Sequence, residues 1–418
     1  MNGDYRLSKV EILFHQKKFK EAEKALSDLL SEDSNNIHYL SLLAEIYLQQ
    51  DKNDLANSII NRAIGLSPDT PNLFYIKSLI AIQQERLSDA ENYINQAIKM
   101  DPYDADYFAL LAKIKLDRKQ FDDALETANQ ALAIDAENLL ALNTRSTTLN
   151  KLNRTEESFE TIEGALRNDP NNAYTHANYG WVLLEKGQHK KAREHFKEAL
   201  LNDPTFEYAQ SGMIEALKAT NPVYRLFLQY SFWMSKLTSK YQWGVIIGFY
   251  IGFRLLRSLA HNNETLRPFL TPLIILLALM AFSTWVITPI SNLFLRFNKY
   301  GQLLLDKKEK MSSNFVASSL GIFAVGLFLY FALSDDRFLT IAVFGFAMML
   351  PLSLMFSPSK YKNAFMNYSL AMAFVGIIGI GLAFITGEVF NMMTVVFIFG
   401  FIGFQFFANY LLIKASNQ

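Results

Sequence analysis

Hydrophobic and polar positions follow two different patterns in the two halves of the chain. Up to about residue 222, apolar residues recur at helical spacing between charged and polar ones, whereas long uncharged runs dominate the rest. The first pattern predicts amphipathic helices that bury one face, and the second predicts helices that are apolar on every side. We therefore expect an all-α chain made of two differently built parts.

Small residues in the first part recur every 34 positions. One series consists of Ala22, Ala56, Ala90, Ala124, Ser158 and Ala192. A second series, seven residues later, consists of Leu29, Ala63, Ala97, Ala131, Ala165 and Ala199. A third, twelve residues before the first, consists of Val10, Ala44, Ser78, Ala112, Ser146 and Gly180. The register continues without an insertion, so the chain contains an internal repeat.

The period and residue types resemble the tetratricopeptide repeat (TPR) over about residues 3–206. The sixth window carries the pattern most fully, with Gly180, Ala192, Phe196, Ala199 and Pro204. The resemblance implies a superhelix of six helix–turn–helix units near 3–36, 37–70, 71–104, 105–138, 139–172 and 173–206. Helices cross closely only where the contact residues are small, which accounts for the conserved spacing of the alanines. With a capping helix at 207–219, the predicted solenoid domain covers 1–222.

Five uncharged runs in the second part are long enough to cross a bilayer as helices, which takes about 20 residues. They cover residues 268–295, 311–334, 338–359, 363–387 and 389–413. A sixth candidate near 243–260 is interrupted by Arg254 and Arg257. With six spans and the N-terminus inside, eleven Lys and Arg residues near the spans face the cytosol and four face away, as the positive-inside tendency requires. We therefore predict a six-helix membrane domain over 241–418.

Between the two parts, residues 223–240 are rich in aromatic residues and poor in charge. Two interpretations stay open for this stretch: an interfacial amphipathic linker at the lipid headgroups, or a helix packed on the end of the solenoid. Gly248 and Gly252 in the sixth candidate span form a GxxxG pair. Such a pair favours close helix packing, either within the chain or with another membrane protein.

The two parts of the chain also differ in net charge. Residues 1–222 carry 25 Lys and Arg against 34 Asp and Glu, whereas residues 223–418 carry 15 against 6. The N-terminus shows no signal-peptide pattern, so we expect the repeats, and with six spans also the C-terminus, in the cytoplasm. The lack of cysteine and the compact loops favour a bacterial inner membrane. The chain has no cysteine, which excludes disulfides and thiolate metal sites.

The candidate binding residues lie on the first helix of each repeat, which lines the groove in the family the chain resembles. They are Tyr75, Leu79, Lys113, Asn143, Thr147, Asn150, Lys151 and Trp181; we call them the predicted groove residues. Lys113, Asn143 and Lys151 could receive an acidic group of a partner. The alternative is an ordinary solvated inner face.

Enzyme and transport chemistry find little support in the sequence. We recognise no nucleotide-binding loop, metal motif or nucleophile motif, and the five long runs contain no ionisable residue of the kind that marks a transport pathway. The sequence therefore predicts a non-enzymatic membrane-anchored scaffold without cofactor, metal or nucleic acid, whose groove recruits a protein partner to an integral membrane complex. A role as an accessory factor of protein export or membrane-protein insertion is a special case. The alternative is a transporter or channel with a regulatory TPR domain.

Overall fold

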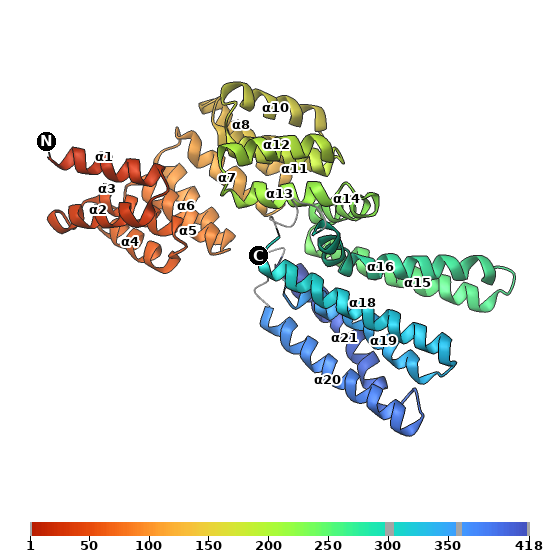
Figure 1. Cartoon of the computed structure of the whole chain (residues 1–418). Coiled ribbons are helices and arrows are strands. Elements are labelled where there is room, and N and C mark those ends of the chain that lie inside the picture. Colours follow the sequence, from red (N-terminus) through yellow and green to blue (C-terminus); the bar gives the residue numbers. More distant parts are fainter. Residues whose placement is uncertain (1, 297–304, 357–361, 416–418) are drawn as a thin grey trace. The chain divides into compact units, whose positions relative to one another are not determined.

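The computed structural model describes residues 2–296, 305–356 and 362–415, without the side chains of residues 2–4, 285, 362, 413 and 415. All the secondary-structure elements assigned in these ranges are helices (Figure 1), which confirms the predicted all-α class. By their internal contacts, residues 1–178 form one compact unit and residues 179–417 form a second. The predicted domain limits, including the one at residue 222, stay predictions.

The six repeats are pairs of helices joined by short turns. The first helices are α1 (Asn2–His15), α3 (Ile37–Gln49), α5 (Pro71–Gln83), α7 (Ala105–Asp117), α9 (Leu139–Lys151) and α11 (Ala173–Glu185). The second helices are α2 (Phe19–Glu32), α4 (Asn53–Leu66), α6 (Leu87–Met100), α8 (Phe121–Ile134), α10 (Thr155–Asn168) and α12 (His189–Asn202). A further helix, α13 (Glu207–Lys218), occupies the place of the predicted cap.

The turn inside each repeat is fixed by one residue with a left-handed backbone. These residues are Lys17, Asp51, Glu85, Lys119, Asn153 and Gly187, again 34 positions apart. In the third repeat, the N–H of Arg86 donates to the carbonyl of Ala81 at 2.8 Å, the bond expected just after a left-handed helix end. The first helix therefore stops at the same place in every repeat.

The small residues of the repeat meet across each helix pair, as the spacing predicts. All members of the first series, from Ala22 to Ala192, are fully buried. Where a serine replaces alanine, its hydroxyl donates to the facing backbone: Ser78 Oγ lies 2.9 Å from the Ala90 carbonyl oxygen, and Ser146 Oγ lies 2.9 Å from that of Ser158. A hydroxyl is tolerated there because it finds an acceptor at close helix approach.

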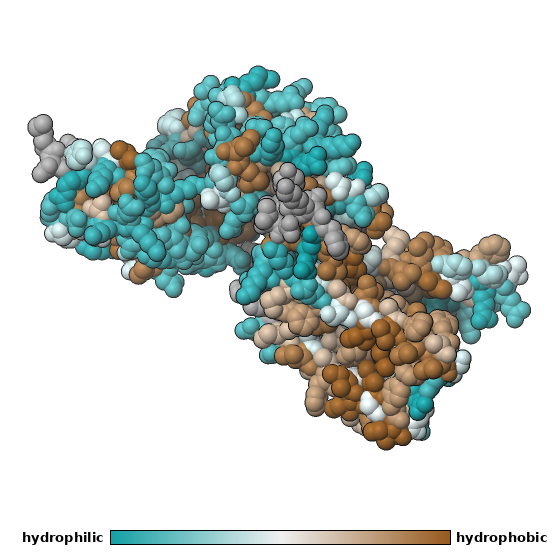
Figure 2. All heavy atoms as spheres, viewed as in Figure 1, coloured by the Kyte–Doolittle hydropathy of each residue, from teal (hydrophilic) through white to brown (hydrophobic). Residues whose placement is uncertain are grey.

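The second unit contains six helices that are long and apolar enough to cross a membrane. They belong to α15 (Ser239–Asn262), α16 (Arg267–Leu295), α18 (Lys307–Leu333), α19 (Arg337–Leu354), α20 (Lys362–Thr386) and α21 (Met392–Ala415). Figure 2 shows hydrophobic residues over the surface of this bundle, and Phe328, Phe374 and Ile385 are each at least two-thirds exposed. Large exposed apolar areas of this kind are expected of surfaces that face lipid.

Glycines mark the closest helix crossing of the bundle, between α18 and α19. A Cβ added to Gly326 would lie 2.5 Å from the backbone nitrogen of Ala342. One added to Gly345 would lie 2.8 Å from the carbonyl oxygen of Ser319, whose hydroxyl donates to the Gly345 carbonyl at 2.7 Å. In contrast, a Cβ at Gly248 or Gly252 on α15 would meet nothing described within 4 Å. Within the described residues, the GxxxG pair does not serve internal packing.

The stretch predicted as a linker forms α14 (Pro222–Lys236). One face of this helix packs on the last repeat: the Phe232 ring lies 6.3 Å from that of Trp181, and Lys236 Nζ lies 3.0 Å from Glu185 Oε1. Its other face leaves Leu226 and Trp233 about half exposed or more. The helix packs on the solenoid end, while its exposed aromatic face leaves the interfacial prediction open.

Candidate protein-binding site

The predicted groove residues fall on the first helices of four consecutive repeats. Tyr75 and Leu79 lie on α5, Lys113 lies on α7, and Trp181 lies on α11. Asn143, Thr147, Asn150 and Lys151 all lie on α9. Trp181 belongs to the second compact unit and the others to the first. In the first unit α7 packs on α9 and α3 on α5, so first helices of neighbouring repeats lie side by side.

Tyr75 is half-buried in an aromatic and acidic environment. Its ring lies 5.6 Å from the ring of Tyr107, at an angle of 37°. Burial, together with the charges of the nearby carboxylates of Asp106, Glu45 and Asp104, raises the pKa of Tyr75 to about 12. The phenol therefore stays protonated at neutral pH, where it can donate a hydrogen bond beside a negative field.

Lys113 already has a partner within its own helix. Its Nζ lies 2.6 Å from Asp117 Oδ2, and both side chains are one-third exposed. A surface pair of this kind contributes little to stability, and a stronger acidic ligand can replace the carboxylate of Asp117. Burial raises the pKa of the half-buried Tyr174 on α11, on which the charges of Lys113 and Asp117 act in opposite directions.

Asn143 joins helices rather than facing solvent. It is fully buried, and its Nδ2 donates to Thr175 Oγ1 at 3.0 Å. Its Oδ1 accepts from Asn178 Nδ2, also at 3.0 Å, so it ties α9 to α11 as a buried polar link. Asn150 is likewise buried on α9, whereas Thr147 is half-buried on the same helix.

Lys151 and Lys119 are the two cationic residues whose charges interact in this part of the first unit. Burial lowers the pKa of Lys119, and the charge of Lys151 lowers it further, so the two ammonium groups are close. Both side chains are half-buried. The first unit thus carries an acidic, aromatic surface at Tyr75 and a basic one at Lys151, instead of a uniform positive groove.

Trp181 is held by aromatic contacts inside the second unit. Its Nε1 donates to the carbonyl oxygen of Tyr208 at 3.2 Å. Its ring centroid lies 5.6 Å from those of both Phe196 and Tyr208. The indole therefore anchors α11 to α12 and α13, and only part of it is left exposed for a partner.

The sequence reasoning did not select Glu45, Tyr107 or the two aspartates beside Tyr75. The repeat register contains a signal for Glu45, because it stands 34 residues before Leu79. Burial raises the pKa of the Glu45 carboxyl. No repeat rule distinguishes Tyr107, which is buried against Tyr75 through a pairing across neighbouring repeats.

Models of known protein families match the part of the chain that contains the repeats. A model described as anaphase-promoting complex, cyclosome, subunit 3 matches residues 15–97. One tetratricopeptide repeat model matches residues 77–139 and 109–173, and another matches residues 161–194. The N-terminal part of the chain is built from tetratricopeptide repeats. This confirms the resemblance seen in the small-residue spacing, and the six apolar helices lie outside the matched residues.

Several solved structures resemble the TPR part. A tetratricopeptide repeat protein from Parabacteroides merdae shares 17% identity, with 52% of this chain and 84% of that chain covered and a TM-score of 0.46. YrrB, described as a TPR protein with an unusual peptide-binding site, shares 17% over 45% of this chain and 97% of that one, with a TM-score of 0.32. TTC0263 from Thermus thermophilus shares 14% over 43% and 98%, with a TM-score of 0.41. No curated protein matches the chain.

Proposed function

We propose that this protein is a membrane-anchored scaffold whose TPR unit binds a protein partner. The observation that carries the proposal is the run of accessible side chains on consecutive first helices of the repeats: Tyr75, Leu79, Lys113, Thr147 and Lys151, all half-buried. Half-buried aromatic and long side chains on a rigid surface are suited to partner recognition, because a partner can bury the remainder. Asn143 ties α9 to α11 beneath this surface, Asn150 is buried on α9, and Trp181 extends the candidate set in the second unit.

The six apolar helices support the anchoring half of the proposal. We propose that they cross a bacterial inner membrane, with the TPR unit and the C-terminus in the cytoplasm. The exposed glycine pair on α15 is suited to contact with another membrane protein or with lipid. An accessory role in protein export or membrane-protein insertion would use both parts, since a cytosolic partner would be held beside an integral membrane complex.

Site-specific photocrosslinking in cells tests the partner surface. A photoreactive amino acid at Leu79 should give a discrete crosslinked protein band that membrane fractionation recovers with this chain. The matched control is the same amino acid at Leu55, an exposed apolar residue on the second helix α4. Tyr75→Ala should weaken the Leu79 crosslink without lowering the amount of protein in the membrane. Equal crosslinking from Leu55 and Leu79 would refute recognition through the first helices.

A further inference from the structure

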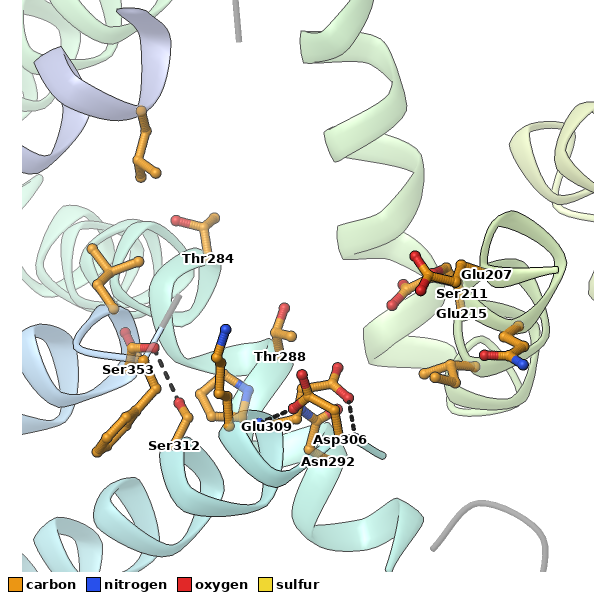
Figure 3. Close-up of a pocket in the computed structure, with 17 residues that line it drawn as sticks. Glu207, Ser211, Glu215, Thr284, Thr288, Asn292, Asp306, Glu309, Ser312 and Ser353 are labelled. Atoms are coloured by element: carbon orange, nitrogen blue, oxygen red, sulfur yellow. Dashed lines mark hydrogen bonds between the residues drawn. The ribbon is translucent and has the colours of Figure 1, made fainter. Parts of the chain in front are cut away.

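A pocket of about 760 Å³ lies within the second unit, between α13 and four apolar helices, α16, α18, α19 and α21. Figure 3 shows Glu207, Ser211 and Glu215 on one side of it and Thr288, Asn292 and Glu309 on the other. Its wall includes the last turn of α16, the first turn of α18 and the last turn of α19. None of the predicted groove residues lines this pocket.

The charge of this pocket is strongly negative. The charged residues that line it are Glu207, Glu215, Asp306, Glu309 and Lys308, four carboxylates against one ammonium. The C-terminal turns of α16 and α19 bring two negative helix-dipole ends to the pocket, and the first turns of α13 and α18 bring two positive ends, so the carboxylates determine its charge. Three His, Asp or Glu side chains arranged to hold a metal ion occur nowhere in the described residues. The four carboxylates attract a cation.

The carboxylates are only partly used by neighbouring groups. Glu215 is paired, because it accepts from Lys218 Nζ at 3.1 Å and from the hydroxyl of Tyr224 at 2.6 Å. Asp306 and Glu309 form the capping box of α18, in which each side chain accepts one backbone N–H through one of its oxygens. The second oxygen of each of these two carboxylates can accept from a ligand.

Asn292 independently indicates that a hydrogen-bond donor is missing from the pocket. It lines the pocket and is 2% exposed, yet its Oδ1 has no hydrogen-bond partner among the described residues. A buried acceptor without a donor destabilises the fold, because it has lost its hydrogen bond to water. A cation that carries N–H donors would satisfy this oxygen and the carboxylates beside it.

The apolar part of the pocket wall restricts the chemical class of the ligand further. Ile214, Pro289, Leu354 and Phe356 line the same pocket as the carboxylates. Lysine and arginine combine an apolar stem with a charged head, and they bury the stem along apolar surface. Arginine fits best, because its planar guanidinium offers five donors in a fixed arrangement that can reach an amide oxygen and a carboxylate together.

We propose that this pocket binds an arginine side chain of a basic protein segment. The head group would donate to Asn292 Oδ1 and to the free oxygens of Asp306 and Glu309, while Glu207 adds charge at the exposed side. The site acts independently of the TPR surface, so either can fail without the other.

The test uses the purified full chain in phosphatidylcholine nanodiscs and a labelled Gly-Ser peptide that carries arginine. Binding is followed by fluorescence anisotropy at constant salt. The double variant Glu207→Gln, Glu309→Gln should bind the peptide with an affinity lower by a factor of about ten or more, since a hydrogen bond to a charged group contributes at least about that factor. Glutamine at position 309 can still complete the capping box, so the fold of α18 is kept. Asn292→Leu should weaken binding by a similar factor.

Two controls make the result specific. The double variant Glu194→Gln, Glu198→Gln removes the same charge from exposed positions on α12, and it should bind the peptide as the native protein does. A peptide with citrulline in place of arginine keeps the shape but loses the charge, and it should not bind. The proposal is overturned if the pocket variants bind normally, if the citrulline peptide binds equally, or if free spermidine binds in a Glu309-dependent way while the peptide does not.

Discussion

Phe196 is held between two glycines, and this makes the effect of one methyl group predictable. The ring is fully buried. A Cβ added to Gly212 on α13 would lie less than 3.0 Å from three of its carbon atoms, and one added to Gly180 would lie 2.7 Å from its Cε1. Ordinary carbon contacts lie at about 3.5–4.0 Å. The ring cannot retreat from one glycine without approaching the other, so Gly212→Ala must distort the packing of α11, α12 and α13.

The size of the effect follows from two opposing contributions. Overpacking a tight core costs roughly 1–3 kcal/mol, and the upper end applies because the ring is blocked on both sides. Alanine in place of glycine in a helix gains about 1 kcal/mol of helix propensity. The free energy of unfolding should therefore fall by about 2 kcal/mol.

Gly164 provides the matched control on α10. A Cβ added there would meet only Arg167 Nη2, at 3.7 Å, which is an ordinary contact. Gly164→Ala should thus raise the free energy of unfolding by about 1 kcal/mol. Urea unfolding of the fragment 1–222, followed by circular dichroism, measures both variants; we predict that this fragment is soluble and helical. If Gly212→Ala stabilised the fragment as much as Gly164→Ala does, the argument from the Phe196 contacts would be wrong.

Three further predictions concern the turns, the topology and the tyrosines. Glu85→Gly should stabilise the repeat fragment by about 0.5–1 kcal/mol in urea unfolding, because glycine adopts the left-handed backbone without a Cβ penalty; a loss of stability would contradict this. Reporter fusions should read cytosolic at Lys308 and on the far side at Glu388, and the same reading at both positions would exclude six spans. Burial raises the pKa values of Tyr75 and Tyr107 to about 12 from 10.0. The unfolded phenols ionise first, so stability should fall between these pH values, and an alkaline unfolding series that is flat there would refute the raised pKa values.

The sequence determined the repeat, the helix pairs and the long apolar helices. These features depend on short-range rules: small residues at fixed spacing, hydrophobic periodicity and the length of an uncharged run. The left-handed residue that ends each first helix also follows the repeat. Gly187, Asn153 and Asp51 are residue types that adopt this backbone readily, whereas Lys17, Glu85 and Lys119 carry no such signal by residue type.

Only the tertiary structure decided which polar residues are accessible and which glycines are packed. Asn143 and Lys113 were both predicted to line the groove, yet Asn143 is buried in a link between helices while Lys113 remains one-third exposed. Gly326 lies against the backbone of another helix, whereas Gly248 faces open space, although both stand in similar apolar stretches. Such differences depend on how segments distant in sequence cross, and a pattern along one helix carries no information on what its neighbour presents.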